Sequence, residues 1–190
     1  MARVTRVYLA RHGQTALNVG GRLRGLSDPP LDDEGLAEAE RLGAVLADRR
    51  PTVVFSSPLQ RAVATAAVIA RRAGVEAKVD ARLNDRDYGP WTGKVKTDVE
   101  HQFGSIDEAP GVEPASEVFA RAKAAFLELV EEADNGPIVL VSHDAINRPL
   151  LRAFDPSLGE VGQRTACWNQ LSLVDGSWRV DSYDQKPDAS

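Results

Sequence analysis

The sequence predicts a three-layer α/β/α sandwich, in which a mostly parallel central sheet with an antiparallel edge strand is covered by helices on both faces. Three observations lead to this fold class. Short apolar segments alternate along the chain with segments whose apolar residues recur at helical spacing. The segment Ile138–Ser142 is continuously apolar, as a central parallel strand is. Asp175-Gly176 separates the two terminal strand segments and is a strong two-residue hairpin signal.

In the first half of the chain, each predicted element has its own start or stop signal. Prolines end the first loop, aspartates cap the helix that follows, and a glycine ends the second helix. Ser57-Pro58 is interpreted as the cap and first residue of that second helix. The predicted elements are, in order, a strand at Val4–Ala10, a glycine-rich loop at Arg11–Leu31, a helix from Asp32 or Asp33 to about Arg49, a strand at Thr52–Ser56, a helix to about Ala73 and a strand at Val75–Val79.

The second half begins with the least regular stretch, Leu83–Glu113, which is rich in glycine and proline. A long loop inside a compact domain is usually functional, and a short helix is predicted within it at about Lys96 to His101. The later elements follow from helical spacing and turn signals. They are a helix capped by Ser116 and running to about Ala133, a turn at Asn135-Gly136-Pro137, a strand at Ile138–Ser142, a helix at about Ala145 to Phe154, and strands at Cys167–Val174 and Ser177–Tyr183.

The length and composition favour one soluble domain. The 190 residues fit a single domain at 1–184, followed by a polar tail at 185–190 that we expect to be disordered. The net charge of −5 argues against a nucleic-acid partner. The chain lacks a membrane-length apolar run and a signal peptide, so we expect a cytoplasmic protein without a membrane partner. Cys167 is the only cysteine and is interpreted as a buried apolar residue. The oligomeric state stays open, with a homodimer among the options.

Candidate chemistry gathers where three predicted strands end. Arg11-His12 follows the first strand, Arg61 lies in the first turn after the second, and His143 follows the apolar strand. Parallel strands place these junctions at one edge of the sheet, where ligands bind in α/β proteins. Two guanidinium groups beside a helix amino terminus suit the oxygens of a phosphate. Each residue alone has a structural interpretation, but together they predict a phosphate site that contains a histidine.

These residues lie in motifs that resemble a known family. Arg11-His12-Gly13-Gln14-Thr15 with Asn18 resembles the signature of the histidine phosphatase superfamily, phosphoglycerate mutase-like branch. Three further motifs resemble that family in the right order and extend the match over nearly the whole chain. They are Ser56-Ser57-Pro58-Leu59-Gln60-Arg61-Ala62 with Thr65, Leu83-Asn84-Asp85 with Gly89, Trp91 and Gly93, and Val141-Ser142-His143 with Arg148.

The resemblance implies a covalent mechanism without a metal or cofactor. His12 is the nucleophile that becomes a phosphohistidine, with one ring nitrogen unprotonated and the other donating to a carbonyl. Arg11, Arg61 and His143 hold the equatorial oxygens of the phosphate. Asn18 donates a further hydrogen bond. A carboxylic acid protonates the leaving oxygen and then activates water.

Two acidic residues depart from the family pattern. Asp85 stands where this branch usually has glutamate, and its reach is about 1.5 Å shorter. We interpret Asp85 as the general acid, with Asp87 as the nearest alternative. The cationic surroundings predict a lowered pKa for Asp85, so that it is protonated only with substrate bound. Asp144 stands where the family often has glycine, where it either orients His143 or repels an anionic substrate.

The sequence therefore predicts a metal-independent phosphomonoesterase, a hydrolase that acts on a small phosphorylated metabolite. Arg24 is predicted to meet a second anionic group of the substrate, with solvent exposure as the alternative. Two other functions stay open. A phosphoglycerate mutase is the first, although the stretch between Asp85 and Ser116 is short for one. The second is a catalytically weak protein that binds a phosphorylated ligand.

Overall fold

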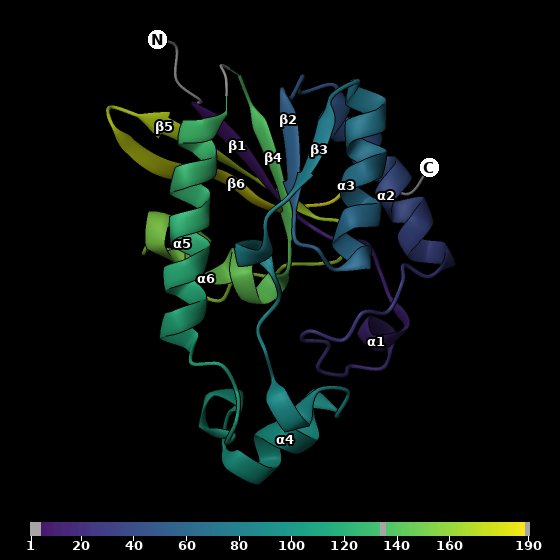
Figure 1. Ribbon diagram of the computed structural model, residues 1–190. Coiled ribbons are helices and arrows are strands. Elements are labelled where there is room, and N and C mark those ends of the chain that lie inside the picture. Colours follow the sequence, from purple (N-terminus) through teal and green to yellow (C-terminus); the bar gives the residue numbers. More distant parts are fainter. Residues whose placement is uncertain (1–4, 134–135, 189–190) are drawn as a thin grey trace.

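A computed structural model describes residues 5–133 and 136–188 of the chain. Within these residues one six-stranded sheet has the strand order β3-β2-β4-β1-β5-β6 (Figure 1). The first four strands in that order are parallel, and β5 and β6 are antiparallel. The predicted fold class is therefore confirmed. The strands are β1 (Arg6–Arg11), β2 (Val53–Ser56), β3 (Glu76–Val79), β4 (Ile138–Ser142), β5 (Trp168–Val174) and β6 (Ser177–Gln185).

Helices cover both faces of the sheet (Figure 1). Alternate residues of the central strands point to opposite faces, so each face has its own apolar core. Val7 and Leu9 of β1 pack with α5 and α6, whereas Tyr8 and Ala10 pack with α2 and α3. This alternation produces the three layers. The helices are α1 (Ala16–Val19), α2 (Asp33–Ala47), α3 (Gln60–Ala73), α4 (Lys96–Phe103), α5 (Ala115–Glu132) and α6 (Asp144–Phe154).

The strand register aligns the carboxyl ends of β1, β4 and β2. Arg11 is paired with Ser142, and Ser56 with Val141. One further backbone bond continues each pairing past the strands, because the His12 amide donates to the Ser142 carbonyl at 3.2 Å and the Ser57 amide donates to the Val141 carbonyl at 3.2 Å. The residues that follow these three strands are therefore fixed at one edge of the sheet.

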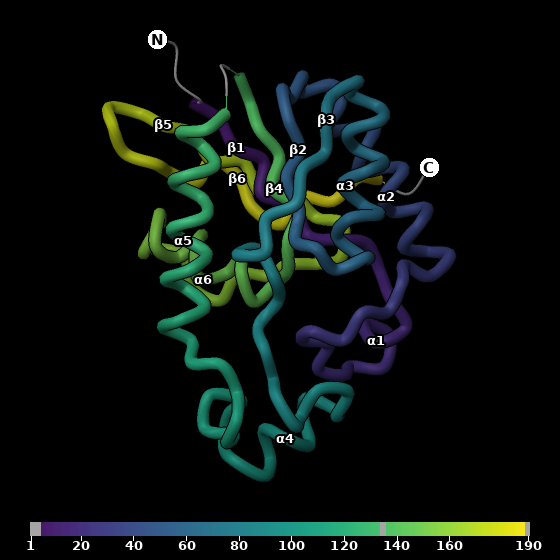
Figure 2. The backbone as a smooth tube through the Cα atoms, in the orientation of Figure 1, coloured from purple at the N-terminus to yellow at the C-terminus, as the bar shows by residue number. Residues whose placement is uncertain are grey.

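Residues 86–114, called the cap below, extend beyond this edge before the chain enters α5 (Figure 2). The cap has a small apolar cluster of its own, in which Trp91 and Phe103 meet edge to face at 4.9 Å between ring centroids. The neighbouring loop, residues 20–31, joins this cluster through Leu23. The Leu23 amide donates to the Lys94 carbonyl at 2.9 Å, so the loop and the cap form one unit. The helix predicted at Lys96 to His101 is confirmed as α4 and ends at Phe103.

Several predicted boundaries differ from the structure. Helix α1 was not predicted, although Thr15 and Asn18 form its capping box. The predicted caps Ser57 and Ser116 are wrong, since Leu59 and Pro114 hold those positions. Val4 of the first predicted strand and Asn135 of the predicted turn lie outside the described residues.

The C-terminal end also differs from the prediction. The hairpin turn at Asp175-Gly176 is confirmed, with positive φ at both residues. Strand β6 runs to Gln185, and Lys186 Nζ lies 2.6 Å from Oε1 of the buried Glu38. The chain is therefore anchored past the start of the tail that was expected to be disordered at 185. The limits of the single domain stay a prediction.

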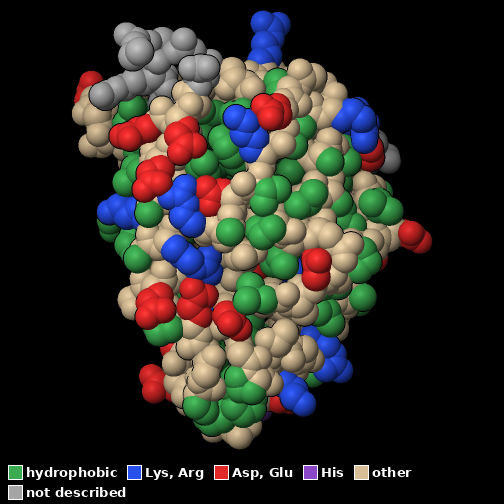
Figure 3. All heavy atoms as spheres, viewed as in Figure 1, with side chains coloured by type: hydrophobic (Ala, Val, Ile, Leu, Met, Phe, Trp, Pro, Cys, Tyr) green, Lys and Arg blue, Asp and Glu red, His purple; other side chains and the backbone are tan. Residues whose placement is uncertain are grey.

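The surface and the helices add two observations. Figure 3 shows acidic and basic side chains interspersed over the face in view, without a continuous basic surface there. Of the helices in the part of the chain that the structure describes, none is long and apolar enough to cross a membrane.

Candidate active site

The carboxyl edge of the sheet brings the predicted site residues together. Arg11 ends β1, His12 follows it, Arg61 lies in the first turn of α3, and His143 precedes α6. The rings of His12 and His143 have centroids 5.1 Å apart. Asp85 reaches the same place from the loop before the cap. All five side chains are buried, and together they are called the floor below.

His12 has the protonation pattern that a nucleophile needs. Its Nδ1 lies 2.7 Å from the Gly13 carbonyl, which can only accept, so Nδ1 carries the proton. Its Nε2 is buried and has no hydrogen-bond partner within the described residues. Burial lowers the pKa of His12 well below its usual value, and the neighbouring His143, Arg11 and Arg61 act in the same direction. The Nε2 lone pair is therefore free at neutral pH.

The backbone beside His12 is held by a close contact with α2. A Cβ built on Gly13 would lie 2.5 Å from the Gly35 carbonyl oxygen, a distance that real Cβ atoms do not show. The Gly13 amide also donates to Thr65 Oγ1 at 3.1 Å. Glycine at this position therefore lets the nucleophile loop lie directly against the first turn of α2.

The two floor arginines are held by backbone carbonyls and keep a donor free. Arg11 donates from Nη1 to the Gln163 carbonyl. Arg61, which is fully buried, donates to the Ser27 carbonyl at 2.7 Å and to the Gly25 carbonyl at 2.9 Å. The Nε atoms of both arginines are buried without a partner in the described part of the chain. These are donors that an oxyanion can use.

His143 is held from the end of β2. Its Nε2 lies 2.8 Å from Ser57 Oγ, which explains why Ser57 does not cap α3. Its Nδ1 has no hydrogen-bond partner among the described residues, and the nearest carboxylate oxygen, Asp85 Oδ2, is 3.7 Å away. Burial lowers the pKa of His143, helped by Arg61 and Arg11, so this ring is also neutral at neutral pH.

Asp85 is the floor carboxyl group and is only 1% exposed. Its Oδ2 accepts from Arg61 Nη2 at 3.1 Å, and its Oδ1 accepts from the Arg86 amide at 2.8 Å. Burial, and after it the negative charge of Asp144, raise the pKa of Asp85 to about 6, against the opposing effects of Arg61 and Arg24. The prediction of a lowered pKa was wrong, because the cost of removing the carboxylate from water outweighs the two cations.

Asp87, the alternative acid, lies elsewhere. Its side chain is exposed, and its Oδ1 accepts from the Gly89 amide at 2.8 Å, within its own turn. Among the described residues, its carboxylate makes no hydrogen bond or ion pair with either floor histidine. The structure therefore brings Asp85, and not Asp87, to the histidines and arginines.

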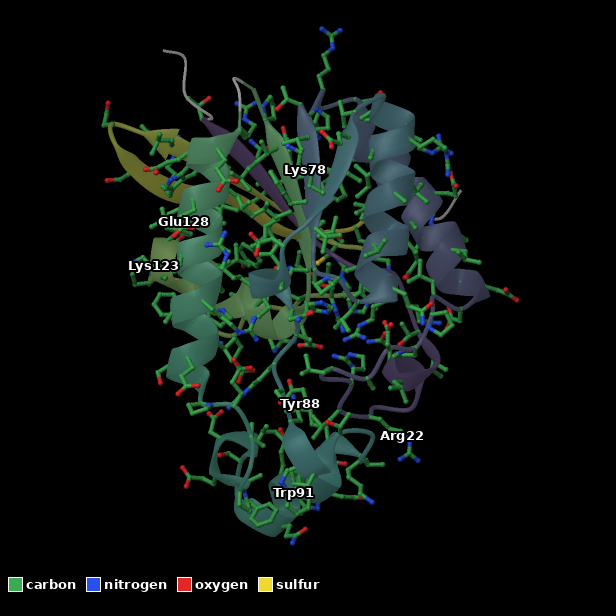
Figure 4. The ribbon with its side chains drawn as sticks, viewed as in Figure 1. Arg22, Lys78, Tyr88, Trp91, Lys123 and Glu128 are labelled. Atoms are coloured by element: carbon green, nitrogen blue, oxygen red, sulfur yellow. The ribbon has the colours of Figure 1, made fainter. Side chains whose placement is uncertain are left out.

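A cavity of about 360 Å³ opens beside the floor. Arg11 belongs to both, and the other walls come from α1, the loop at 20–31, the cap and the start of α6. Figure 4 shows Tyr88 between the sheet edge and α4, with Arg22 at the outer side. The cavity is lined by Arg11, Gln14, Asn18, Gly21, Arg22, Leu23, Arg24, Tyr88, Lys96, Asp144 and Thr165.

Both predicted substrate-binding residues line this cavity. Asn18 Oδ1 accepts from the Thr15 backbone amide at 2.9 Å and from the Thr15 hydroxyl at 2.8 Å. The side-chain nitrogen of Asn18, Nδ2, is therefore the group left for a ligand in the cavity. Arg24 is mostly buried, and its Nη2 lies 3.3 Å from Asp144 Oδ1. The alternative that Arg24 is solvent-exposed does not fit this position.

The sequence did not predict the residues that hold the floor side chains in place without belonging to the floor. Gln163 holds Arg11 through its carbonyl, and its side chain bonds to Asn147 and Asn169. These residues come from a loop and from elements of ordinary composition, which carry no local signal. Ser57 was detectable, because it is a polar residue directly after β2 at the same sheet edge. Within the described residues there is no group of three or more His, Cys, Asp or Glu side chains arranged to hold a metal ion.

Comparison with known proteins decides the family. The model of the histidine phosphatase superfamily (branch 1) matches residues 7–186. The chain belongs to the histidine phosphatase superfamily. The family prediction made from the four motifs is thus confirmed.

Several relatives that match nearly the whole chain in sequence are phosphatases. The chain is 32% identical to the glucosyl-3-phosphoglycerate phosphatase of Mycobacterium tuberculosis, over 99% of this chain and 98% of that protein. A solved structure of the mycobacterial glucosyl-3-phosphoglycerate phosphatase complexed with VO3 has a TM-score of 0.84 and 31% identity, and covers 96% of this chain and 100% of that one. These matches support the predicted phosphomonoesterase.

A solved phosphoglycerate mutase structure from Bacillus anthracis covers 97% of this chain with a TM-score of 0.88, but its 24% identity shows the fold alone. A mutase of higher sequence identity matches a smaller part of the chain. The 2,3-bisphosphoglycerate-dependent phosphoglycerate mutase of Bifidobacterium longum is 39% identical over 104 residues, which is 52% of this chain and 42% of that protein. The mutase alternative is therefore weaker than the phosphatase. The chain is an enzyme of the class that hydrolyses phosphate monoesters.

Proposed function

We propose that the chain hydrolyses small phosphate monoesters through a covalent phosphohistidine on His12. One observation carries this proposal: the neutral His12 has an unpartnered, buried Nε2 beside the free donors of Arg11 and Arg61. A nucleophile needs a lone pair, and the oxygens of a phosphate need fixed donors. The floor combines both in one place.

In the first step, His12 Nε2 forms a bond to phosphorus while the bond from phosphorus to the ester oxygen breaks. Arg11 and Arg61 hold the equatorial oxygens and offset the charge that develops on them. Asp85 gives its proton to the leaving alkoxide, so the alcohol departs neutral. A carboxyl group with a pKa raised to about 6 is suited to this role, since it holds a proton more readily than an exposed aspartate.

In the second step, water attacks the phosphohistidine. The Asp85 carboxylate takes one proton from the water as the oxygen bonds to phosphorus, and the bond to Nε2 breaks. Inorganic phosphate leaves, and His12 and Asp85 return to their starting forms. His143, neutral and held by Ser57, supplies a further polar contact to the phosphate oxygens. We propose Asn18 as an additional donor from the cavity wall.

The proposed substrates are small phosphorylated metabolites, because a cavity of about 360 Å³, within the size range of small-molecule sites, adjoins the floor. The substrates to be tested are sugar phosphates, phosphoglycerates, nucleotides and phosphopeptides. Glucosyl-3-phosphoglycerate, from which one relative takes its name, should be tested with them. The cytoplasmic location, the absence of nucleic-acid partners and the homodimer stay predictions.

The deciding experiment is rapid-quench labelling with a phosphoester labelled at phosphorus. We expect acid-labile phosphohistidine in the wild type, phosphate release in steady state, and neither in the variant His12→Ala. Loss of the nucleophile should lower kcat by at least about 10³-fold. Steady turnover that survives in His12→Ala would exclude the covalent mechanism.

The same experiment separates the two alternatives. A mutase would convert one phosphoglycerate isomer into the other faster than it releases phosphate. A protein that only binds phosphorylated ligands would show neither turnover nor labelled histidine.

A further inference from the structure

The backbone that carries Asp85 is held by a single arginine of α5. Arg121 Nη1 donates to the Arg82 carbonyl at 2.9 Å and to the Asn84 carbonyl at 2.7 Å. Arg121 Nη2 donates to the carbonyl of Asp85 itself at 3.0 Å. One side chain therefore binds three of the four backbone carbonyls from residue 82 to residue 85.

The fourth carbonyl of this segment is held from the sheet. The Leu83 carbonyl accepts from the Ser142 hydroxyl at 2.7 Å, and this contact is buried. Ser142 is the last residue of β4 and directly precedes His143. The segment at 82–85 is thus fixed between α5 and the end of the strand that leads to a floor histidine.

Arg121 has no donor left for a ligand. A guanidinium group has five N–H donors, and three of them go to the carbonyls at 82, 84 and 85. The other two go to Glu113, from Nε to Oε1 at 2.8 Å and from Nη2 to Oε2 at 3.0 Å. Arg121 is also absent from the lining of the cavity beside the floor. Its contacts therefore serve the backbone of the protein and not the substrate.

Glu113 fixes the guanidinium group of Arg121 in place. Burial raises the pKa of Glu113, but the hydrogen bonds from Arg121 and from the Asp87 amide outweigh burial and lower that pKa below its usual value. Glu113 is therefore ionised at neutral pH. Its two charge-assisted hydrogen bonds hold the plane of the guanidinium group, so that the remaining donors face the three carbonyls.

The position of this backbone decides whether the carboxyl group of Asp85 reaches the reaction. Asp85 Oδ2 lies 3.1 Å from Arg61 Nη2 and 3.7 Å from His143 Nδ1. An aspartate side chain is about 1.5 Å shorter than the glutamate that is usual in this branch. It can therefore compensate less for a displaced backbone. A displacement of about 1 Å at a reacting group can slow a reaction about 10²-fold.

We propose that Arg121 is a positioning residue for the general acid, because it fixes the backbone of Asp85 where the short carboxyl group reaches the leaving oxygen. The inference rests on the proposed function, in which His12 Nε2 bonds to phosphorus, the ester bond breaks and the Asp85 proton passes to the leaving oxygen. Arg121 acts on the proton transfer alone and touches no reacting atom.

The test compares a leaving group that needs a proton with one that does not. An alkoxide is a strong base and must be protonated, whereas 2,4-dinitrophenolate is a weak base and leaves as the anion. The two substrates are the alkyl phosphate of the panel with the highest kcat/KM, and 2,4-dinitrophenyl phosphate. A loss that is confined to the alkyl phosphate identifies a defect in proton transfer.

Arg121→Lys is the variant to measure. Lysine keeps the positive charge beside Glu113 but has three donors and no planar fork, so it cannot hold all three carbonyls. We expect kcat/KM for the alkyl phosphate to fall about tenfold to 10²-fold, and kcat/KM for 2,4-dinitrophenyl phosphate to stay within about threefold of the wild type.

Arg82→Lys is the matched control. Arg82 also joins this segment to α5, because its guanidinium group forms ion pairs with Asp80 and with Glu128 of α5. The substitution leaves the Arg82 carbonyl, which Arg121 binds, in the chain. Both values of kcat/KM should stay within about threefold of the wild type. A selective loss equal to that of Arg121→Lys would show that any weakened contact with α5 suffices, and would overturn the assignment to Arg121.

Asp85→Asn separates the failure of this inference from the failure of the proposed function. It should lose about 10²- to 10⁴-fold in kcat/KM for the alkyl phosphate and keep most of its activity toward 2,4-dinitrophenyl phosphate. If Asp85→Asn shows no such selectivity, the proposed role of Asp85 fails and the inference fails with it. If Asp85→Asn is selective and Arg121→Lys lowers both values equally, or neither, Arg121 is merely structural and the inference alone is overturned.

A second variant keeps the test decisive if Arg121→Lys does not fold. Glu113→Gln leaves Arg121 in the chain but removes the charge that fixes its guanidinium group. It should produce the same selective loss for the alkyl phosphate, about threefold to tenfold. Equal losses for both substrates, or none, would overturn the inference.

Discussion

The floor of the site and its wall are built in different ways. The floor follows the carboxyl ends of the parallel strands, and its side chains are buried and held by backbone groups. The wall, formed by the loop at 20–31 and the cap, rests on a small apolar cluster separate from the two main cores. The difference indicates that the sheet fixes the chemistry, while the loop and the cap determine which ester enters.

The largest effect is expected from replacing Asp85, the proposed proton donor on the floor. Asp85→Asn keeps the side chain's shape but removes the transferable proton, so kcat should fall about 10²- to 10⁴-fold. The pH profile adds a second readout. Because burial raises the pKa of Asp85 to about 6, the acid form predominates below that pH. The kcat/KM of the wild type should therefore decline as pH rises through about 6, and Asp85→Asn should lack that decline.

Asp87→Asn is the natural control for this prediction. Asp87 is two residues away and exposed, and its carboxylate accepts from the Gly89 amide within its own turn. We expect near-native turnover and an unchanged pH profile. If Asp85→Asn retained native kcat while Asp87→Asn lost it, the assignment of the acid would be reversed.

A second prediction tests whether the floor depends on backbone packing. Gly13→Ala places a methyl group 2.5 Å from the Gly35 carbonyl oxygen, so the nucleophile loop or α2 must shift. We expect a loss of about 1–3 kcal/mol in the free energy of unfolding, as for other overpacked sites. The kcat should fall with it, because His12 lies directly beside the displaced backbone. Chemical denaturation and steady-state kinetics measure the two effects.

Gly20→Ala, at the start of the loop at 20–31, is the matched control for Gly13→Ala. Its φ is −80°, and the nearest atom to an added Cβ is 3.6 Å away on the flexible Arg22 side chain. Stability and kcat should stay close to those of the wild type. Equal losses in Gly13→Ala and Gly20→Ala would contradict the claim that the floor is the more tightly packed region.

The same division separates what the sequence could predict from what it could not. The positions of His12, Arg61 and His143 could be predicted, because the end of an apolar segment marks the end of a strand in the sequence. The carboxyl ends of neighbouring parallel strands lie at the same edge of the sheet. The raised pKa of Asp85 was not, since burial depends on residues distant in the sequence. The prediction that Ser57 caps a helix was wrong, because a local capping preference cannot reveal that its hydroxyl contacts His143, 86 positions away. Local signals thus describe the strands well and the contacts between loops poorly.

The smallest expected effect is that of a substitution in the wall. It distinguishes a change in substrate binding from a change in the rate of the chemical step. Trp91→Ala removes the edge-to-face contact with Phe103 and the hydrogen bond from Nε1 to the Pro110 carbonyl at 2.8 Å. Trp91 does not touch the floor, so loosening its cluster should shift the wall residue Tyr88 and leave His12 in place. We expect KM to rise roughly threefold to tenfold with kcat within about twofold, the pattern of lost uniform binding.

Tyr183→Ala removes an exposed aromatic side chain of β6 that is absent from the cavity lining, and should change neither constant. A fall in kcat for Trp91→Ala without a rise in KM would show that the cap takes part in the chemical step. The floor and the wall would then act as one unit, because disturbing a cluster that makes no contact with His12 would have slowed bond formation at its Nε2. A rise in KM alone leaves selectivity to the wall.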